Sequence, residues 1–476
     1  MSATTAPIDL TTTLQTMFDR QRLHAPVQAL TTAAERIDRL KRLQHWMLTN
    51  EEAIQQALYA DFRKPAPEVS LAEIYAVNSE LKFIIRHLKR WMKPQRVPTP
   101  LNMVGTTGYI RHEPKGNVLI ISPWNYPFSL MIKPLLAALA AGNVVMLKPS
   151  ELTPHTAALL NRMVQALFPP EEVALVEGDA AVAQALLDQP FNHIFFTGSP
   201  AVGRLVMAAA AKHLASVTLE LGGKSPAIVD ETAPLAEAAG QIAWGKCINN
   251  GQTCIAPDYL LVHESVKAPF LEAFRTAVQR MYNADGRGVE ASDSYARIVN
   301  QRHFQRVRRL IDDAVEKGAS ISLGGQVNES TNFIEPTVLD GVTSDMQVMQ
   351  EEIFGPVLPI LTYRNREEVV QQVNAGEKPL ALYIHSRNQQ NIDYFLAHTS
   401  AGDTVINDMM LQYSHPEIPF GGVNNSGIGK SNGYFGFQEF SNQRGVVRRD
   451  FGTLKFVYPP YTPRVRKLIN TLMKYF

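Results

Sequence analysis

Apolar side chains recur every three or four residues in two stretches of the first hundred positions: Leu40, Leu43, Trp46 and Met47, then Ile74, Val77, Leu81 and Ile84. This period predicts two amphipathic helices that each bury one face. The second stretch ends in four basic residues, Lys89, Arg90, Lys93 and Arg96, before a proline-rich segment. Cations in the last turn of a helix interact favourably with its dipole, and proline ends a helix. We therefore interpret this cluster as a helix end; the alternative is a basic surface patch.

From residue 117 onward, short apolar runs alternate with helical stretches. The expected strands are 117–122, 143–147, 173–176, 193–197 and 216–221, and the expected helices between them are 130–141, 154–168, 180–187 and 200–213. Strands that alternate with helices of this length predict right-handed crossovers, and hence a parallel sheet.

The same alternation resumes after Gly222-Gly223. Strands are expected at 227–229, 259–262 and 320–323, and helices at 235–247 and 266–282. The pattern predicts an α/β protein built from two doubly wound α/β domains that meet near Gly222-Gly223.

The composition supports this organisation and excludes some classes of function. The chain has 476 residues, about three times a typical domain of roughly 150. Lys and Arg number 46 and Asp and Glu number 45, so the net charge of +1 gives no support to nucleic-acid or membrane binding driven by charge. No basic segment precedes an apolar run at the start, and no stretch reaches the roughly 18 apolar residues of a membrane span. We expect a cytoplasmic protein.

Only two cysteines are present, Cys247 and Cys254. Two thiols exclude a disulfide scaffold, a zinc site of four cysteines and a cysteine-ligated iron–sulfur cluster, and the histidines form no ligand cluster, so no metal is expected. Cys247 lies in an apolar helical stretch and is typical of a small buried hydrophobe. Cys254 follows the loop Gly251-Gln252-Thr253, which a ligand can approach closely. A thiol there, near N–H donors, could have a lowered pKa and act as a nucleophile; the alternative is a second buried cysteine.

Two further residues could serve such a nucleophile. Glu220 ends an apolar strand between Leu219 and Leu221, and burial there would raise its pKa and make it a general base. The alternative is a surface charge on an edge strand. Asn125 lies in a stiff turn between Pro123 and Pro127, from which its amide could donate to a developing oxyanion; the alternative is an asparagine that only completes the turn.

One strand–helix turn could meet a pyrophosphate. Gly198 and Ser199 follow the strand 193–197, with Gly203 five residues after the first glycine. Backbone N–H groups and the helix dipole would favour an anion there, with Ser199 as the N-cap and Pro200 as the first helical residue. The spacing differs from G-x-G-x-x-G, so a plain strand–turn–helix explains the motif equally well.

A second turn could hold a ribose. Lys148, Ser150 and Glu151 follow the strand 143–147, and ligands of open α/β sheets bind beyond the carboxyl ends of strands. The alternative is a capped helix start. Gly223-Lys224-Ser225 and Gly429-Lys430-Ser431 lack the first glycine of a phosphate-binding loop, so ATP binding of that type is not expected.

These motifs are more specific as a set than any one of them. They occur in the order Pro123-Trp124-Asn125-Tyr126-Pro127, Lys148-Pro149-Ser150-Glu151, Phe196-Thr197-Gly198-Ser199, Leu219 to Pro226, Gly251-Gln252-Thr253-Cys254, Glu351-Glu352-Ile353-Phe354-Gly355-Pro356 and Pro419-Phe420-Gly421-Gly422. In this respect, and in the 34-residue step from Glu220 to Cys254, the chain resembles the aldehyde dehydrogenase superfamily over nearly its full length. Cys254-Ile255-Ala256-Pro257-Asp258-Tyr259 resembles the shorter class 3 type, and bacterial coniferyl aldehyde dehydrogenases look most similar.

The resemblance implies roles for the candidate residues. Cys254 would add to the aldehyde carbonyl, the Asn125 amide and the Cys254 N–H would hold the oxyanion, and Glu220 would activate water to release the acid. It implies a set of cofactor-binding residues: Trp124, Lys148, Ser150, Glu151, Gly198, Ser199, Gly203, Leu221, Gly222, Glu352 and Phe354. Glu352 would hold the nicotinamide ribose, and Lys148 and Glu151 the adenosine ribose. Glu151 favours NAD because a carboxylate repels a 2′-phosphate, although class 3 enzymes often accept NADP as well.

The resemblance also implies domains, an assembly and a substrate class. Residues 1–98 and 115–222 would form the NAD(P)-binding domain, 223–421 the catalytic domain, and 99–114 with 422–476 a bridging and oligomerisation arm of a homodimer. The substrate would be an aromatic or cinnamyl-type aldehyde such as coniferyl aldehyde, or a medium- or long-chain aliphatic one. The alternatives are an enzyme that passes the acyl group to coenzyme A, against which Glu220 argues, and a non-catalytic protein on the same fold.

Three features of the chain raise separate questions. Asn250 stands where the family usually has a small residue, and could reshape the wall beside Cys254. Asn424 stands where glycine is usual, but asparagine tolerates a left-handed backbone.

Near the C-terminus, Val465, Leu468, Ile469, Leu472 and Phe476 recur at helical spacing among basic residues. We expect this helix to dock on the protein or on a second subunit, with membrane contact as a minority alternative.

Overall fold

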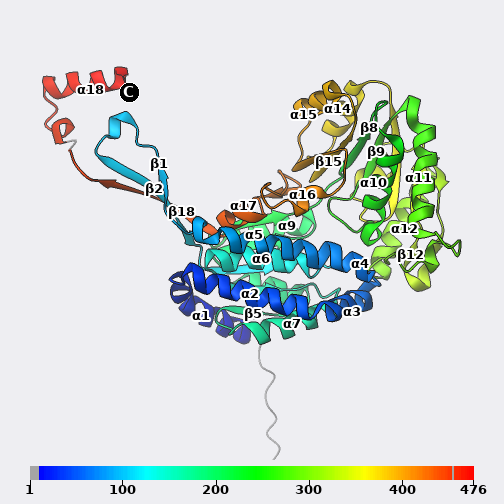
Figure 1. The fold of residues 1–476 in the computed structure, drawn as a ribbon, viewed down its shortest axis with the longest axis horizontal. Coiled ribbons are helices and arrows are strands. Elements are labelled where there is room, and N and C mark those ends of the chain that lie inside the picture. Colours follow the sequence, from blue (N-terminus) through cyan, green and yellow to red (C-terminus); the bar gives the residue numbers. More distant parts are fainter. Residues whose placement is uncertain (1–9, 453–454, 476) are drawn as a thin grey trace, which may run out of the picture.

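The computed structural model describes residues 10–452 and 455–475; Phe476 and the first nine residues lie outside them. Figure 1 shows two α/β lobes and an extended arm. The first lobe holds a six-stranded sheet in the order β17-β7-β6-β3-β4-β5, and the second a seven-stranded sheet in the order β10-β13-β14-β9-β8-β15-β16. Both sheets are parallel except for one edge strand each, β17 and β10. The predicted fold class is confirmed.

The first sheet is buried on both faces. Its strands are β3 (Asn117–Ile121), β4 (Val144–Lys148), β5 (Val173–Leu175), β6 (His193–Thr197), β7 (Ser216–Glu220) and β17 (Gly427–Ile428). One face is covered by α2 (Ala33–Thr49), α3 (Glu51–Phe62), α5 (Ala76–Trp91), α6 (Ser129–Ala141) and α7 (Pro154–Leu167). The other is covered by α1 (Leu10–Ala29), α8 (Ala180–Leu187) and α9 (Pro200–Ala211). Val118 and Ile120 face the first of these cores and Leu119 and Ile121 the second, as the alternation of strand side chains requires.

The second sheet is built in the same way. Its strands are β8 (Pro226–Val229), β9 (Tyr259–His263), β10 (Ser320–Leu323), β13 (Thr337–Asp340), β14 (Val357–Tyr363), β15 (Ala381–His385) and β16 (Asp403–Ile406). The main helices around it are α10 (Leu235–Cys247), α11 (Lys267–Tyr282), α12 (Gln301–Glu316), α14 (Arg366–Ala375) and α15 (Gln389–His398). The sequence pattern did not predict β13 to β16, because short apolar runs do not distinguish a buried strand from a buried helix segment.

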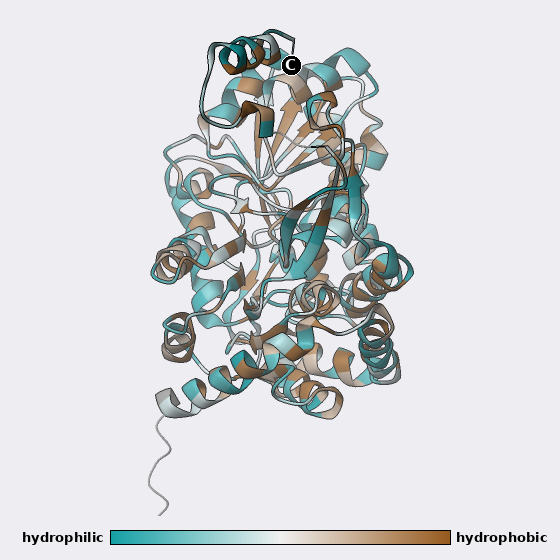
Figure 2. Cartoon of the chain, turned by 90° about the vertical axis from the view of Figure 1, so that its left-hand side faces the viewer, coloured by the Kyte–Doolittle hydropathy of each residue, from teal (hydrophilic) through white to brown (hydrophobic). Residues whose placement is uncertain are grey.

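The arm consists of β1 (Gln95–Val97), β2 (Thr106–Pro114), β18 (Ser441–Arg449) and α18 (Pro463–Tyr475). The three strands form an antiparallel sheet in the order β1-β2-β18. Figure 2 views the molecule from the arm side and shows largely hydrophobic strands inside the lobes but hydrophilic strands in front. Between β17 and the arm, α17 (Gly433–Glu439) packs against α6, so residues 427–439 lie with the first sheet. No helix among the described residues is long and apolar enough to cross a membrane.

Candidate active site

Cys254 lies on a tight loop between α10 and β9. The 3-10 turn η3 (Ile248–Gly251) follows α10, and Asn249, Asn250 and Gly251 have φ angles of 53°, 57° and 71°. A Cβ at Gly251 would lie 2.3 Å from the Gly355 carbonyl oxygen, so glycine is needed both for its left-handed backbone and for this close approach. The loop turns sharply and presents Cys254 at the junction of the two lobes.

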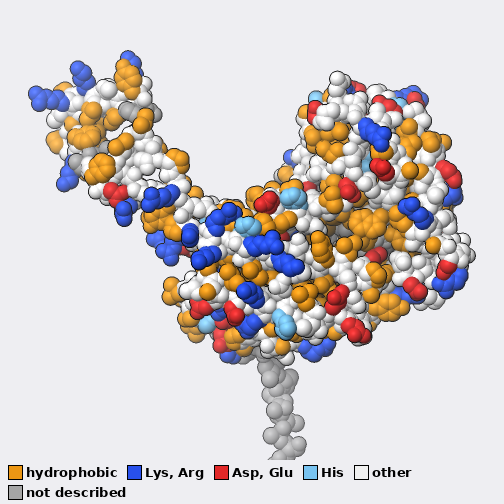
Figure 3. Space-filling model, viewed as in Figure 1, with side chains coloured by type: hydrophobic (Ala, Val, Ile, Leu, Met, Phe, Trp, Pro, Cys, Tyr) orange, Lys and Arg blue, Asp and Glu red, His pale blue; other side chains and the backbone are white. Residues whose placement is uncertain are grey.

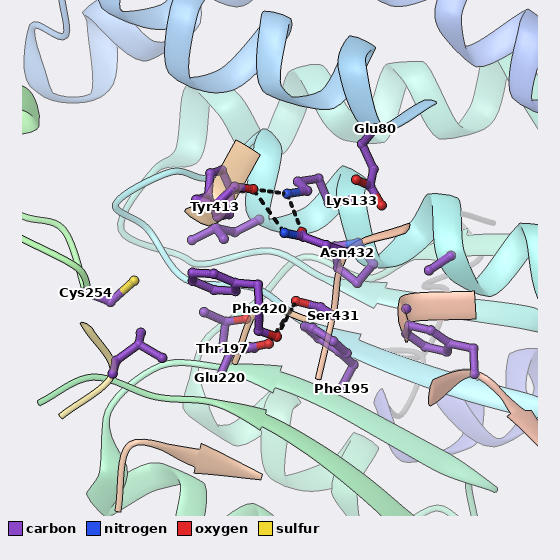
Figure 4. Close-up of a pocket in the computed structure, with 16 residues that line it drawn as sticks. Glu80, Lys133, Phe195, Thr197, Glu220, Cys254, Tyr413, Phe420, Ser431 and Asn432 are labelled. Atoms are coloured by element: carbon purple, nitrogen blue, oxygen red, sulfur yellow. Dashed lines mark hydrogen bonds between the residues drawn. The ribbon is translucent and has the colours of Figure 1, made fainter. Parts of the chain in front are cut away.

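Three hollows meet at Cys254. The first, here the large cleft, has a volume of about 490 Å³ and runs between the carboxyl ends of the first sheet and the segment 351–354. The second, the apolar cavity, has a volume of about 320 Å³ and opens between η1 (Val69–Tyr75), α10 and the segment 409–414. The third, the internal cavity, is only about 40 Å³ and connects Cys254 with Glu220 (Figure 4). Cys254 is therefore reachable from both larger hollows.

The large cleft brings together most of the residues predicted to bind a cofactor. Its walls include Trp124, Asn125, Gly198, Ser199, Leu221, Gly222, Glu352 and Phe354. The others do not line it: Lys148 is the last residue of β4, Ser150 and Glu151 follow that strand, and Gly203 lies in α9. The Lys148 ammonium pairs with the Glu151 carboxylate at 3.0 Å, and β4 adjoins β3 in the sheet.

The cleft has the shape and polarity that a dinucleotide requires. A Cβ at Gly198 would lie 2.4 Å from the Phe196 ring, and one at Gly222 would lie 2.3 Å from Glu352 Oε2. Glycine is therefore needed at both positions, because the Phe196 ring and the Glu352 carboxylate pack directly against the backbone there. Ser199 caps α9 by accepting from the Val202 N–H, and Pro200 is its first residue, as predicted. The N-terminus of α9 thus faces the cleft, where it favours phosphate.

Asn125 is held by two hydrogen bonds to residues of the Cys254 loop. Its Nδ2 donates to the Gln252 carbonyl at 3.0 Å, and Asn249 Nδ2 donates to the Asn125 carbonyl at 2.9 Å. Asn125 is 3% exposed, and the bond from its Nδ2 to the Gln252 carbonyl fixes the orientation of the side-chain amide. Asn125 and Cys254 both line the large cleft, and the amide has a second N–H that can donate to a ligand there.

Glu220 is a buried carboxylate at the end of β7. Burial raises its pKa to about 8, Ser431 Oγ donates to its Oε1 at 2.9 Å, and its Oε2 has no hydrogen-bond partner among the described residues. The prediction of a desolvated carboxylate facing a cavity is confirmed. A group with this pKa is partly ionised near neutral pH and can accept a proton.

The two thiols differ less in pKa than the sequence suggested. Cys247 is fully buried, as predicted, and burial raises its pKa to about 12. The expectation of a lowered pKa for Cys254 is wrong: burial raises it well above its usual range, and the charges of Glu352 and Glu220 add to this rise. Backbone N–H groups of Cys254 and Ile255 oppose the shift but are outweighed. Cys254 therefore rests as a thiol and needs a base to become a nucleophile.

Several site residues were missed by the sequence reasoning. Arg306 reaches the large cleft from α12 and donates to the Glu352 carbonyl at 3.1 Å. His303 lies one turn earlier, against Trp124. Lys133 and Glu80 line the internal cavity from α6 and α5. No local motif marks any of these four, because each faces the site only through the packing of its helix. The described residues contain no cluster of potential metal ligands.

Both unusual asparagines have a structural explanation. Asn250 is buried with a left-handed backbone, and its Nδ2 donates to the Ala296 carbonyl at 2.9 Å. Its side chain therefore points away from Cys254 and does not line the three hollows. Asn424 also has a positive φ, of 55°, which glycine would otherwise supply.

Comparison with known proteins agrees with the geometry of the site. Residues 13–446 match the model of the aldehyde dehydrogenase family, and the chain belongs to this family. It is an NAD(P)-dependent oxidoreductase that acts on aldehydes.

Particular relatives cover almost the whole chain. The 4,4′-diaponeurosporen-aldehyde dehydrogenase of Staphylococcus aureus is 42% identical over 90% of this chain and 92% of its own length. A protein of Pseudomonas aeruginosa named "Probable coniferyl aldehyde dehydrogenase" is 39% identical over 96% of both. A solved structure, the substrate-bound state of Staphylococcus aureus AldH, superimposes with a TM-score of 0.92 at 39% identity, covering 97% of this chain and 99% of that one.

Proposed function

We propose that this protein oxidises an apolar aldehyde to the carboxylic acid, with Cys254 as the nucleophile, Asn125 as an oxyanion donor and Glu220 as the general base. One observation carries this proposal. Cys254 lies where the large cleft and the apolar cavity meet, and the internal cavity joins it to a buried carboxylate whose pKa is about 8.

The residues can perform the chemistry in two stages. Glu220 takes the thiol proton while the sulfur bonds to the aldehyde carbon, and the Asn125 amide with the Cys254 N–H stabilises the oxyanion. A nicotinamide bound in the large cleft supplies the hydride acceptor. Loss of hydride from the carbon leaves a thioester on Cys254, and Glu220 releases the thiol proton to solvent. Glu220 next takes a proton from water as the water oxygen bonds to the thioester carbon. The carbon–sulfur bond then breaks, which frees the acid, and Glu220 returns its proton to the Cys254 thiolate.

The cofactor-binding roles follow from the large cleft. We assign the nicotinamide ribose to Glu352, the ring contact to Phe354 and Trp124, the pyrophosphate to Gly198, Ser199 and the start of α9, and the adenosine ribose to Lys148, Ser150 and Glu151. Leu221 and Gly222 form the floor, and Leu221 contacts Gly203. The Glu151 carboxylate supports a preference for NAD over NADP, because it repels a 2′-phosphate.

The apolar cavity supports the substrate class. Its lining is almost entirely hydrophobic or aromatic: Leu71, Ala72, Tyr75, Ala76, Tyr126, Leu130, Trp244, Ile248, Ile255, Met409, Met410, Leu411 and Tyr413. Such a wall favours an aromatic aldehyde of the coniferyl type or an aliphatic chain of medium or greater length. Relatives named for coniferyl aldehyde and for a carotenoid aldehyde support the same class.

We further propose a cytoplasmic homodimer with the predicted two domains and arm, except that residues 427–439 belong with the first sheet and Gln95–Val97 with the arm. Phe451 and Phe456, beyond β18, are 67% and 53% exposed, which supports contact between the arm and a second copy of the chain. Figure 3 shows Lys and Arg side chains along the outer edge of the arm. The mixture of charge and apolar surface on α18 supports docking on a protein; liposome binding that is lost on truncation after Pro460 would instead support membrane contact.

The decisive experiment compares the two cysteines. Cys254→Ala is expected to abolish NADH formation from aldehydes, while Cys247→Ala, the matched control, retains it because Cys247 lines none of the three hollows. Products are then identified with and without coenzyme A. Free acid in both cases supports hydrolysis by Glu220, acyl-CoA shows the acylating alternative, and no NADH across coniferyl aldehyde, benzaldehyde, hexanal and a long-chain aldehyde shows the non-catalytic one.

A further inference from the structure

The internal cavity contains two charged residues to which the proposed function gives no part. Cys254 and Glu220 line one side of it, and Lys133 and Glu80 line the other (Figure 4). Lys133 comes from α6 and Glu80 from α5, so both belong to the helical layer over the first sheet. Neither side chain lines the large cleft or the apolar cavity.

The cavity is suited to an ordered water beside Glu220. Glu220 Oε2 is buried and has no hydrogen-bond partner among the described residues. A buried polar oxygen without a partner is costly, and the cavity, at about 40 Å³, is large enough for a water molecule. A water there would lie between the general base and the far wall.

Lys133 is a buried cation without a directly paired anion. It is 9% exposed, and its Nζ donates to the Tyr413 carbonyl at 2.9 Å and to Asn432 Oδ1 at 2.7 Å. The ammonium also lies 3.8 Å from the centre of the Tyr413 ring. No described carboxylate lies within ion-pair distance of the Lys133 ammonium. The two carboxylates that act on it, from a greater distance, are Glu80 and Glu220. Burial lowers the pKa of Lys133, and both carboxylates oppose this shift.

Glu80 is held in place from another direction. It is 5% exposed, and its Oε1 accepts from the backbone N–H of Gly433, at the start of α17. That bond orients the carboxylate toward the cavity that Lys133 also lines. A glutamine could accept the same bond without the charge, which makes the charge testable by itself.

We propose that Lys133 and Glu80 are positioning residues of opposite effect: across the internal cavity, the Lys133 ammonium stabilises ionised Glu220, while Glu80 weakens that effect. Together they shift the pH range in which Glu220 takes a proton from water. This inference rests on the proposed role of Glu220 as the base.

The sign follows from the groups that act on Glu220 and from Glu80, which acts on Lys133. Burial raises the pKa of Glu220 to about 8, and Asp403 raises it too; Ser431, Lys430 and Lys133 lower it. The base acts only when it is deprotonated, so thioester hydrolysis rises with pH through this value. Removing the Lys133 charge should move the midpoint to higher pH. Removing the Glu80 charge leaves Lys133 less compensated and should move it to lower pH.

The experiment measures hydrolysis alone. Cys254 is acylated with p-nitrophenyl acetate, and the loss of the acyl group is followed across the neutral and alkaline range. We expect Lys133→Met to raise the midpoint by about one pH unit and Glu80→Gln to lower it by less, in keeping with the effect of a neighbouring charge. Glu439→Gln is the matched control, because Glu439 accepts from Thr218 Oγ1 at 2.8 Å outside the cavity, and its midpoint should equal that of the wild type.

The outcomes separate the inference from the function on which it rests. Midpoints that stay unchanged, or that move in the same direction in both variants, overturn the inference while acylation of Cys254 still supports the proposed function. If the ester does not acylate Cys254 in the wild type, the proposed function fails. If Lys133→Met does not fold, the shift in Glu80→Gln decides alone, because a purely structural role would not lower the midpoint.

Discussion

The large cleft and the apolar cavity both reach the Cys254 sulfur, but different kinds of residue line them. The cleft is walled by the ends of parallel strands, by glycines without side chains and by Glu352, Ser199 and Arg306. The cavity is walled by apolar helix faces and by Met409 and Met410. The first arrangement recognises one ligand through fixed polar groups, and the second accepts any apolar chain that fits. Selectivity for the cofactor and tolerance for the aldehyde are therefore separable properties of this molecule.

The large cleft and the internal cavity each hold a carboxylate near Cys254, Glu352 in the first and Glu220 in the second. Burial raises the pKa of both Glu220 and Glu352 to about 8. Their surroundings differ: the Glu220 Oε2 faces the internal cavity without a partner, while Glu352 lies against the Gly222 backbone. The first carboxylate has an oxygen free for a proton from water. The second is placed to accept hydrogen bonds from a ligand in the large cleft.

The largest loss of activity is expected from Asn125→Ala, because the Asn125 amide serves the reaction at Cys254 whichever aldehyde or cofactor is bound. Asn125→Ala should lower kcat/KM by about 10²–10³, the range for loss of one oxyanion donor, with every aldehyde and with either cofactor. Steady-state kinetics with NAD and NADP check this. An effect confined to one substrate would show that Asn125 belongs to one hollow and not to the junction.

A smaller effect, on the cleft side alone, is expected from Gly222→Ala. The new Cβ would lie 2.3 Å from Glu352 Oε2, so the carboxylate must move. Overpacking of this kind costs about 1–3 kcal/mol, which would raise the KM for NAD by about 5- to 150-fold. The KM for hexanal should change little. Equal changes in both values would mean that the two hollows are mechanically coupled.

The smallest effect is expected on the apolar side, from Ala72→Leu. Ala72 lines the cavity from η1, and a larger side chain shortens the space for an aliphatic tail. In a cavity this roomy, kcat/KM for a long-chain aldehyde relative to hexanal should fall a few-fold, below the roughly tenfold that one methylene can cost in a tight pocket. NAD kinetics serve as the internal control. A higher KM for NAD would contradict the separation of the two hollows.

The folding pattern was largely predictable where local signals repeat. Helix α10 and strand β10 begin and end at the predicted residues, and the burial of Leu40, Leu43 and Met47 follows the helical period. The three remaining predicted strands and helices of the second domain differ from the structure by one residue at one end. The hydrophobic period and the capping residues are signals that span only a few residues of the chain. They therefore predict a helix or strand without knowledge of the surface against which it packs.

The sequence by itself determined the two-domain α/β plan, the buried character of Cys247 and the candidate trio Cys254, Glu220 and Asn125, because each depends on neighbours in the chain. Only the tertiary structure decided the electrostatics of the site. Burial at the junction raises the pKa of Cys254 instead of lowering it, and the charges of Glu352 and Glu220, which come from different elements, add to this rise. Lys133 and Glu80 line the internal cavity only because α5 and α6 pack over the first sheet, and no motif in the sequence predicts this position. Charge interactions depend on distance and burial in space, which no local spacing encodes.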